Sequence, residues 1–168
     1  MEFRKATMAD ANGILKMIRQ AQAYLKSQGI DQWQNNYPNL ETIQKDIHDQ
    51  IGYVLVKDGF LLGTVAVSFA GERTYDRIYE GEWKSIQPHA VIHRIAVHEE
   101  YKGQGLSAVM LERIEKICLE KGVHSIKVDT HEENLSMQKF LEKNGFVYCG
   151  VIYLTDHSKR IAFEKILA

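Results

Sequence analysis

The chain has only two cysteines among its 168 residues, and this scarcity argues against two kinds of stabilising site. Cys118 and Cys149 lie in apolar patterns and form no CxxC spacing, so we expect neither a disulfide framework nor a zinc site. Free cysteines of this kind suit a reducing interior. We therefore predict a protein that holds no metal.

Long apolar runs and an excess of charge of one sign are also missing. No apolar run reaches the roughly 18 residues that a membrane-spanning helix needs, and residues 1–5 lack the apolar core of a signal peptide. The formal net charge of -1 and the pI ≈ 6.7 provide no basic field for nucleic acid or an anionic membrane. These absences predict a soluble, cytoplasmic protein with no membrane and no nucleic-acid partner.

Repeats, low-complexity tracts and linkers are absent, and the hydrophobic content of 45% is ordinary for a globular protein. A chain of this length can bury about 68–70% of its unfolded surface, which is enough for one core. We expect a single domain over residues 1–168.

Hydrophobic periodicity divides the chain into strand and helix patterns. Runs of branched and aromatic residues predict strands at 3–6, 52–57, 60–70, 91–97, 125–130, 146–154 and 161–167. Three-and-four spacing, with capping residues before and glycines after, predicts helices at about 10–28, 39–49, 105–121 and 134–143. Residues 71–88 fit neither pattern and are expected to form a loop or an irregular extension of the sheet.

The order of these elements predicts the fold class. A helix between the strands at 91–97 and 125–130 permits a parallel pair, whereas hairpins such as the one at Asp58-Gly59 require antiparallel pairs. The predicted fold is mixed α/β (α+β). It has a mostly antiparallel sheet of about six to seven strands, about four flanking helices, and a parallel strand pair around the central helix.

The stretch from residue 91 to residue 107 is the most informative part of the sequence. An apolar strand is followed by a polar turn, by Gly103 and Gly105, and by a helix that begins near Leu106. This arrangement directs unpaired backbone N–H groups and the positive end of a helix toward a bound anion. We therefore predict that residues 102–107 bind a cofactor that carries phosphate.

Residues 103–108 also satisfy the G-x-G-x-x-A fingerprint of dinucleotide-binding folds. That fingerprint normally opens the first strand–helix unit of a domain, whereas here it lies past mid-chain and after a hairpin. A P-loop is excluded because the chain has no GxxxxGK[ST] segment. A glycine-rich turn that binds nothing is the other alternative, and these six residues alone do not choose between binding and no binding.

Two blocks of the sequence resemble motifs of the GNAT superfamily of N-acetyltransferases. Residues 97–107 are similar to the acyl-CoA signature [RQ]-x-x-G-x-[GA], with Lys102 and Ser107 as mild departures from it. Residues 134–146 resemble the downstream segment N-x-x-A-x-x-[FL]-Y-x-K-x-G-F, at the usual distance. The resemblance covers essentially the whole chain and implies a GNAT-like fold with acetyl-CoA as co-substrate.

The resemblance also implies which residues contact coenzyme A. Backbone N–H groups of the glycine loop would cradle the pyrophosphate, the end of the central strand would pair with the pantetheine arm, and the second block would lie along the arm or the adenosine. Asn134 also serves as a helix cap, and core packing is the favoured role of Phe140. The implied residues are Ile95, Ala96, Val97, Lys102, Gly103, Gln104, Gly105, Leu106, Ser107, Asn134, Phe140 and Lys143.

Acetyl transfer to an amine needs a neutral nucleophile, a stabilised oxyanion and a protonated leaving thiolate. Because an alkylammonium has a pKa near 10.4 and a thiol near 8.5, the amine must lose a proton and the thiolate must gain one. The resemblance implies direct attack in a ternary complex, with the backbone N–H of Val97 polarising the thioester carbonyl. Cys149 as an acyl-carrying nucleophile is the competing mechanism, but its apolar surroundings favour core packing.

The proton acceptor and donor are open to several residues. Asp129 is the favoured base, because a buried carboxylate without a partner is costly and its place in a strand is hard to explain as packing. His93 and His131 are alternative bases whose pKa values lie naturally near neutrality. A salt bridge between Asp129 and Arg94 is equally open, as is an anchor for a charged substrate built from Asp129 with His93 or Arg94.

The family's usual proton donor is a tyrosine, and Leu141 occupies that position here. Tyr148, or else Tyr153 or a water molecule, would have to protonate the thiolate. The same replacement makes an alternative of another class plausible, a non-catalytic acyl-CoA-binding or sensing module.

Large aromatic residues gather in the two variable segments that shape the acceptor side in this family, Tyr75 among them. An aromatic-lined pocket suits a small amine or amino-acid-like acceptor better than a protein N-terminus or lysine, which is the alternative. Plugging the ends of the sheet or forming a homodimer contact is an equal alternative for these side chains. The predicted substrate-binding residues are Trp33, Tyr37, Tyr79, Trp83, Arg94 and His131.

Overall fold

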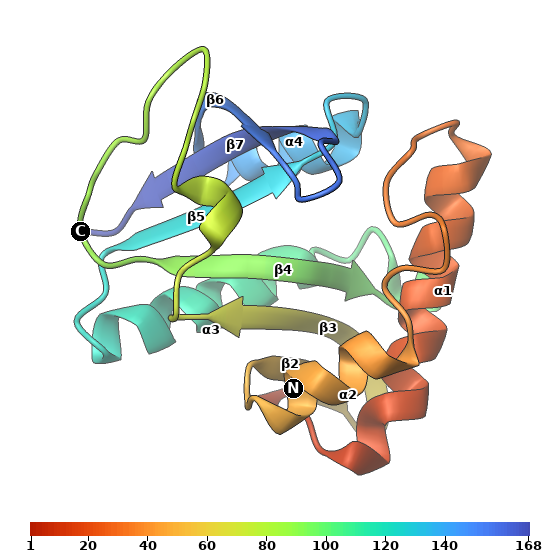
Figure 1. Ribbon diagram of the computed structural model, residues 1–168. Coiled ribbons are helices and arrows are strands. Elements are labelled where there is room, and N and C mark those ends of the chain that lie inside the picture. Colours follow the sequence, from red (N-terminus) through yellow and green to blue (C-terminus); the bar gives the residue numbers. More distant parts are fainter. The chain divides into compact units, whose positions relative to one another are not determined.

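The computed structural model describes residues 1–168 (Figure 1). The strands are β1 Glu2–Lys5, β2 Gly52–Lys57, β3 Phe60–Ser68, β4 Ala90–Val97, β5 Ser125–Thr130, β6 Val147–Tyr153 and β7 Lys159–Ile166. The α-helices are α1 Ala11–Ser27, α2 Leu40–His48, α3 Leu106–Glu120 and α4 Leu135–Lys143. None of the helices combines the length and the apolarity that crossing a membrane would require.

The strand order in the sheet is β1-β2-β3-β4-β5-β7-β6. The pairs β1–β2, β2–β3, β5–β7 and β6–β7 are antiparallel, and β4 pairs with β5 in parallel through Ala90 opposite Ile126 and Val91 opposite Lys127. The predicted mixed α/β fold, with its mostly antiparallel sheet and one parallel pair, is confirmed.

The chain divides into two compact units that interleave in the sequence. The first unit comprises Met1–Val67 and His93–Ile114, and the second comprises Ser68–Ile92 and Glu115–Ala168. Because β4 and α3 each contribute residues to both units, neither unit is one continuous segment. The expectation of a single domain stays a prediction.

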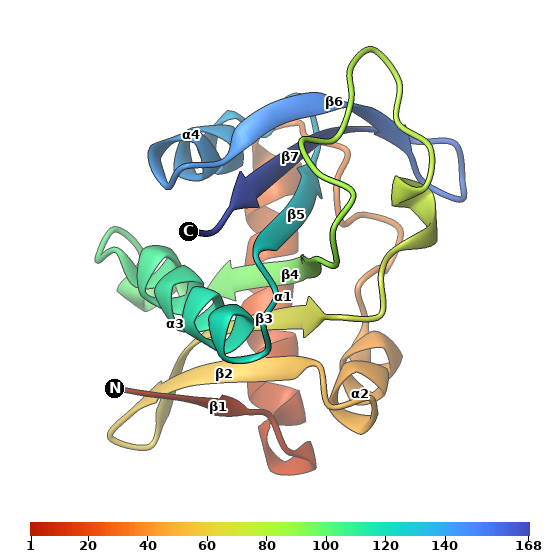
Figure 2. The ribbon, with the colours of Figure 1, turned by 90° about the vertical axis from the view of Figure 1, so that its left-hand side faces the viewer.

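In the first unit, α1 lies across one face of β1, β2 and β3 (Figure 2). A 3-10 turn at Met8–Asp10 leads into α1, and Asp10 closes this turn by accepting a hydrogen bond from the Thr7 backbone N–H at 2.8 Å and pairing with Arg4 at 2.8 Å. The predicted hairpin turn is present, with positive φ at Asp58 and Gly59. The core cluster joins α1, α2, β2 and the end of β4, and it consists of Ala6, Ala11, Ile14, Met17, Ile18, Ile43, Val54 and Ala96.

In the second unit, β5, β7 and β6 form an antiparallel ladder, and residues 71–88 are seated on it. A short 3-10 turn at Arg73–Tyr75 is followed by a β-bridge between Tyr79 and Val151. The close approach requires a glycine, because a Cβ at Gly81 would lie 2.0 Å from the Cys149 carbonyl oxygen. Residues 71–88 are therefore an irregular segment bonded to the sheet through this bridge.

The buried carboxylate of Glu164 on β7 holds the end of this segment. It accepts hydrogen bonds from the Lys84 backbone N–H at 2.7 Å, the Ser85 hydroxyl at 2.6 Å and the Ser125 hydroxyl at 2.7 Å. A buried carboxylate without such donors would be costly, and three donors satisfy it. This contact, between residues about eighty positions apart, is invisible in the sequence pattern.

Candidate functional site: a glycine loop and two carboxylate pairs

The loop between β4 and α3 contains a 3-10 turn at Glu99–Tyr101 and the two glycines. Gly103 has φ 80 and Gly105 has φ 74, left-handed conformations that glycine adopts without steric cost. No heavy atom lies within 4 Å of the position that a Cβ would take at either glycine. The loop is therefore open on the side where a side chain would otherwise stand.

The backbone N–H groups of residues 103 to 108 donate to no acceptor in the protein. The first N–H of this helix to donate backward is that of Val109, which bonds to the Gly105 carbonyl at 3.2 Å. Consecutive unpaired N–H groups at the positive end of a helix attract anions. Groups of this kind can donate to the oxygen atoms of an anion.

Contacts within the first unit hold this loop in place. The Glu99 N–H donates to the Gln20 side-chain oxygen at 3.0 Å, and the His98 N–H donates to the Leu62 carbonyl at 2.9 Å. The ammonium of Lys102 lies 4.4 Å from the centre of the Tyr24 ring. A loop fixed before binding loses less entropy when a ligand binds.

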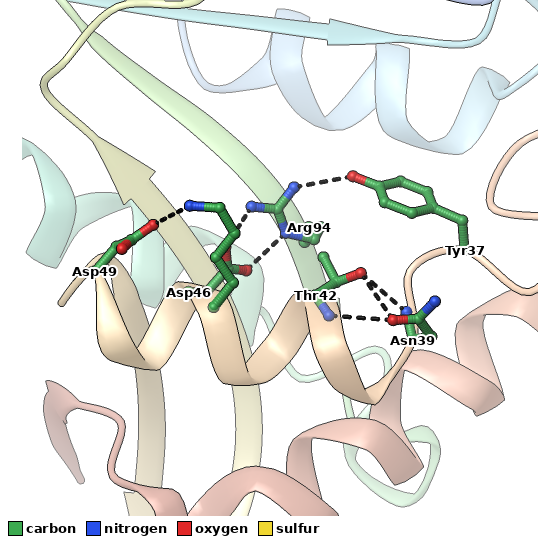
Figure 3. Close-up of polar contacts among 7 residues, drawn as sticks. Tyr37, Asn39, Thr42, Asp46, Asp49 and Arg94 are labelled. Carbon is green, nitrogen blue, oxygen red and sulfur yellow. Dashed lines mark hydrogen bonds and ion pairs between the residues drawn. The ribbon is translucent and has the colours of Figure 1, made fainter.

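The second feature of the first unit is the Arg94 side chain (Figure 3). Its Nε and Nη2 atoms donate to the two carboxylate oxygens of Asp46, each at 2.7 Å, and Nη1 donates to the Tyr37 hydroxyl at 3.3 Å. Burial lowers the pKa of Arg94, but hydrogen bonding to Asp46 and its charge outweigh this and raise it. The partner of Arg94 is therefore Asp46 on α2, so the alternative of a salt bridge between Asp129 and Arg94 is wrong.

The neighbouring imidazole of His93 is half-buried. Its pKa is lowered to about 4, first by burial and then by the charge of Arg94. A base whose pKa lies about three units below neutrality takes up a proton at pH 7 at a cost of roughly 4 kcal/mol. His93 is thus neutral at physiological pH and a weaker candidate base than the sequence predicts.

In the second unit, a carboxylate is paired with a phenol instead of a guanidinium. The half-buried Asp129 on β5 accepts a hydrogen bond from the Tyr75 hydroxyl at 2.7 Å. Burial raises the pKa of Asp129, and the Tyr75 hydrogen bond and the charge of Arg160 only partly oppose this. Burial and the nearby Asp129 charge raise the pKa of Tyr75 well above its ordinary value, so the phenol stays protonated. A carboxylate with a raised pKa and a neutral partner is suited to exchange protons.

The remaining catalytic candidates are less constrained. Tyr148 is 48% exposed on β6, with its ring edge-on to Phe163. The Nδ1 atom of His131 accepts the Glu133 N–H at 3.0 Å, which assigns the proton of the neutral ring to Nε2. Leu141 is 1% exposed and serves as a core residue.

Cys149 is also buried, and burial raises the pKa of its thiol, which disfavours the thiolate that an acyl carrier needs. In the second sequence block, Asn134 caps α4 by accepting the Met137 N–H at 3.2 Å, as predicted, while Phe140 is half-buried and Lys143 is exposed. Their predicted contacts with coenzyme A stay predictions.

The predicted substrate-binding aromatics take different positions. Trp33 packs against the core cluster of the first unit, and the exposed Tyr37 meets Arg94. In the second unit, Trp83 donates its Nε1–H to the Tyr75 carbonyl at 2.9 Å, and Tyr79 stacks edge-on against Tyr153. Trp83 is therefore part of the packing of residues 71–88, whereas Tyr37 is available at a charged site.

The sequence did not indicate two contacts, the pairing of Asp46 with Arg94 and the hydrogen bond from Tyr75 to Asp129. Asp46 follows Ile43 by three positions and so lies at the edge of the buried face of α2, a signal that could have been read. The contact between Tyr75 and Asp129 joins residues 54 positions apart across an irregular segment, and no local pattern indicates it.

This fold, with an open glycine loop at the start of a helix, is shared with a known acetyltransferase, and comparison with known proteins identifies the family. Residues 16–146 match the model of the Acetyltransferase (GNAT) family. The chain belongs to this family, so the dinucleotide-binding alternative is set aside.

Three proteins of known name or structure are similar to this chain. The S-alkylcysteine N-acetyltransferase of Bacillus subtilis is 28% identical over 120 residues, which are 70% of this chain and 60% of that protein. The chain thus spans about 60% of the length of this relative. A GNAT-family acetyltransferase from Streptococcus agalactiae superimposes with a TM-score of 0.90 at 33% identity, covering 99% of this chain and 95% of that one. The PaiA N-acetyltransferase of Thermoplasma acidophilum, solved in complex with coenzyme A, shares the fold with a TM-score of 0.73 at 20% identity and 98% coverage of both chains.

Proposed function

We propose that this protein transfers an acetyl group from acetyl-CoA to the primary amine of a small amine or amino-acid-like acceptor, by direct attack. The observation that carries the proposal is the run of backbone N–H groups at residues 103 to 108 that have no acceptor in the protein. Acyl transfer from coenzyme A requires a pyrophosphate site of this kind, and family membership indicates the donor.

The glycine loop would hold the donor by its pyrophosphate, through Gly103, Gln104, Gly105, Leu106 and Ser107. The adjoining residues Ile95, Ala96 and Val97 at the end of β4 would carry the pantetheine arm, and the Val97 N–H would polarise the carbonyl. When bound, acetyl-CoA supplies the carbonyl carbon: a C–N bond forms to the amine and the C–S bond to the thiol breaks.

The acceptor must lose a proton before it attacks, and Asp129 is the proposed base. Its raised pKa brings it closer to the working pH than an ordinary carboxylate, which improves general-base catalysis. Tyr148 is the proposed donor of a proton to the leaving thiolate, since Leu141 cannot serve. The named activity of the Bacillus subtilis relative, on an S-alkylcysteine, supports an acceptor with the size and amine of an amino acid.

The test is an assay of thiol release from acetyl-CoA over a panel of amines and amino acids that includes S-alkylcysteines, lysine and a peptide N-terminus. We expect turnover with small acceptors and an N-acetylated product by mass spectrometry. Coenzyme A binding without turnover on any acceptor would favour the non-catalytic module instead. Turnover restricted to the peptide or to protein lysines would support a protein acetyltransferase.

A further inference from the structure

The Arg94 guanidinium is held in one orientation by two-point contact with Asp46. Both side chains are mostly buried, with exposed fractions of 16% and 13%. Arg94 also has φ 51, a left-handed conformation inside strand β4 that a residue with a Cβ adopts at a cost and keeps only where its surroundings hold it. The paired contact with Asp46 is such a hold, so the guanidinium is pre-oriented.

This guanidinium retains donors that the protein does not use. An arginine has five N–H donors, and Asp46 takes two of them and Tyr37 one, which leaves two on the outer Nη1 and Nη2 atoms. The Tyr37 hydroxyl accepts from Arg94, so its own proton is also without an acceptor in the protein. Three unused donors therefore meet at one place.

Such a set of donors fits a carboxylate. The outer edge of a guanidinium binds both oxygens of a carboxylate in parallel, and the charge of the pair makes these bonds about twice as strong as neutral ones. Asp46 occupies the other edge of the guanidinium, so a second carboxylate would not compete with it for the same N–H groups.

A small hollow lies beside the pair, with room for about one water molecule. Arg94 and Asp46 line it together with apolar side chains of α1 and α2, Ile14, Ile18, Ile43 and Ile47. Apolar walls reduce the local dielectric and strengthen hydrogen bonds at the polar end.

We propose that Arg94 and Tyr37 form a carboxylate-binding site, oriented by Asp46, which selects amino acids with a free carboxylate as acceptors. This inference rests on the proposed acetyl transfer and specifies its substrate class. Asp46 is a positioning residue here, because it acts through Arg94.

The test compares each amino acid with its carboxamide, which keeps the amine and the side chain and removes only the charge. The wild-type protein is expected to favour the acid in kcat/KM. In R94K, which keeps the charge and loses the fork, and in Y37F, we expect kcat/KM for the acid to fall, by about 10- to 100-fold for R94K and several-fold for Y37F. The value for the carboxamide should fall less than that for the acid in both variants, because its carbonyl forms only neutral-acceptor hydrogen bonds.

The Asp46→Asn variant separates positioning from simple electrostatics. Removing the negative charge leaves more positive charge at the site, so attraction alone would lower KM for the acid. A positioning role predicts the reverse, a higher KM for the acid with kcat and the KM for acetyl-CoA unchanged. If the single variant Asp46→Asn does not fold, the double variant Asp46→Asn with Arg94→Gln avoids the unpaired buried charge. This double variant should abolish the preference for the acid.

Binding measurements keep this test separate from the proposed function. Calorimetry with an N-acetyl amino acid and its carboxamide measures carboxylate recognition even if no turnover occurs. Equal binding and equal kcat/KM for acid and amide, or equal losses for both in R94K and Y37F, would overturn the carboxylate site. Absence of turnover with preserved acid-selective binding would overturn only the acetyl-transfer proposal.

Discussion

The two units of the protein differ in the polar groups at their candidate sites. The first unit presents donors that lack protein acceptors, namely the N–H groups of residues 103 to 108 and the outer edge of Arg94. The second unit presents carboxylates whose donors come from the protein, Tyr75 for Asp129 and three groups for Glu164.

The difference separates binding from proton transfer. Asp46 is bonded to a permanent cation, so its role is to orient, whereas Asp129 is bonded to a neutral phenol and has a raised pKa, so it can gain and lose a proton. A carboxylate's function thus depends on its partner. Four changes test this contrast.

The largest effect is expected from Asp129→Asn. Without a base, kcat at neutral pH should fall by about 10²- to 10⁴-fold, and the fall in kcat on the acid side, where Asp129 becomes protonated, should disappear. Steady-state kinetics from acid to neutral pH provide the measurement. The exposed Asp31→Asn is the matched control and should keep the wild-type profile; a wild-type profile in Asp129→Asn as well would exclude it as the base.

Glu164→Ala should cause the largest loss of stability. It leaves the Lys84 N–H and the Ser85 and Ser125 hydroxyls without their acceptor, at a cost of about 3 kcal/mol or more in the free energy of unfolding. Urea denaturation measures this loss. Glu142→Ala on the exposed side of α4 should stay within about 0.5 kcal/mol of wild type; equal losses in the two variants would contradict a structural role for Glu164.

Gly105→Ala tests the role of the unpaired backbone N–H groups in the glycine loop. A Cβ in a left-handed conformation costs about 1–2 kcal/mol, and relief of this strain would displace the N–H groups of the loop. We expect a several-fold higher KM for acetyl-CoA. Gly29, with φ 70 and equally open space, provides the control, since Gly29→Ala should lose similar stability and leave this KM unchanged. A raised KM in both variants would point to general destabilisation.

The smallest change is expected from Tyr75→Phe. The Tyr75 hydroxyl donates to Asp129 and lowers its pKa, so its removal raises that pKa further. The acid side of the kcat–pH profile should therefore move to higher pH, with a lower rate at neutral pH. Because Tyr75 is buried, the urea midpoint is measured in parallel. An acid limb that stays in place or moves to lower pH would disconnect Tyr75 from the titrating group.

Much of the fold was predictable because its signals are local. Asn39 and Asn134 cap helices, Asp58-Gly59 turns a hairpin, and alternating branched residues mark the strands, and each of these acts within a few residues. Strand and helix ends consequently agree with the structure to within about two residues, the usual uncertainty of such boundaries. Residues 71–88 could not be assigned, because the Tyr79–Val151 bridge and the Glu164 contacts join segments far apart in the sequence.

The sequence by itself determined the order of elements, the glycine loop and the family to which it belongs, because backbone conformation and helix polarity follow from neighbouring residues. The tertiary structure alone decided which charges meet. It paired Arg94 with Asp46, gave Asp129 a phenol as its partner, and left His93 desolvated with a pKa of about 4. Burial and distant partners set these properties, and neither can be read from local sequence.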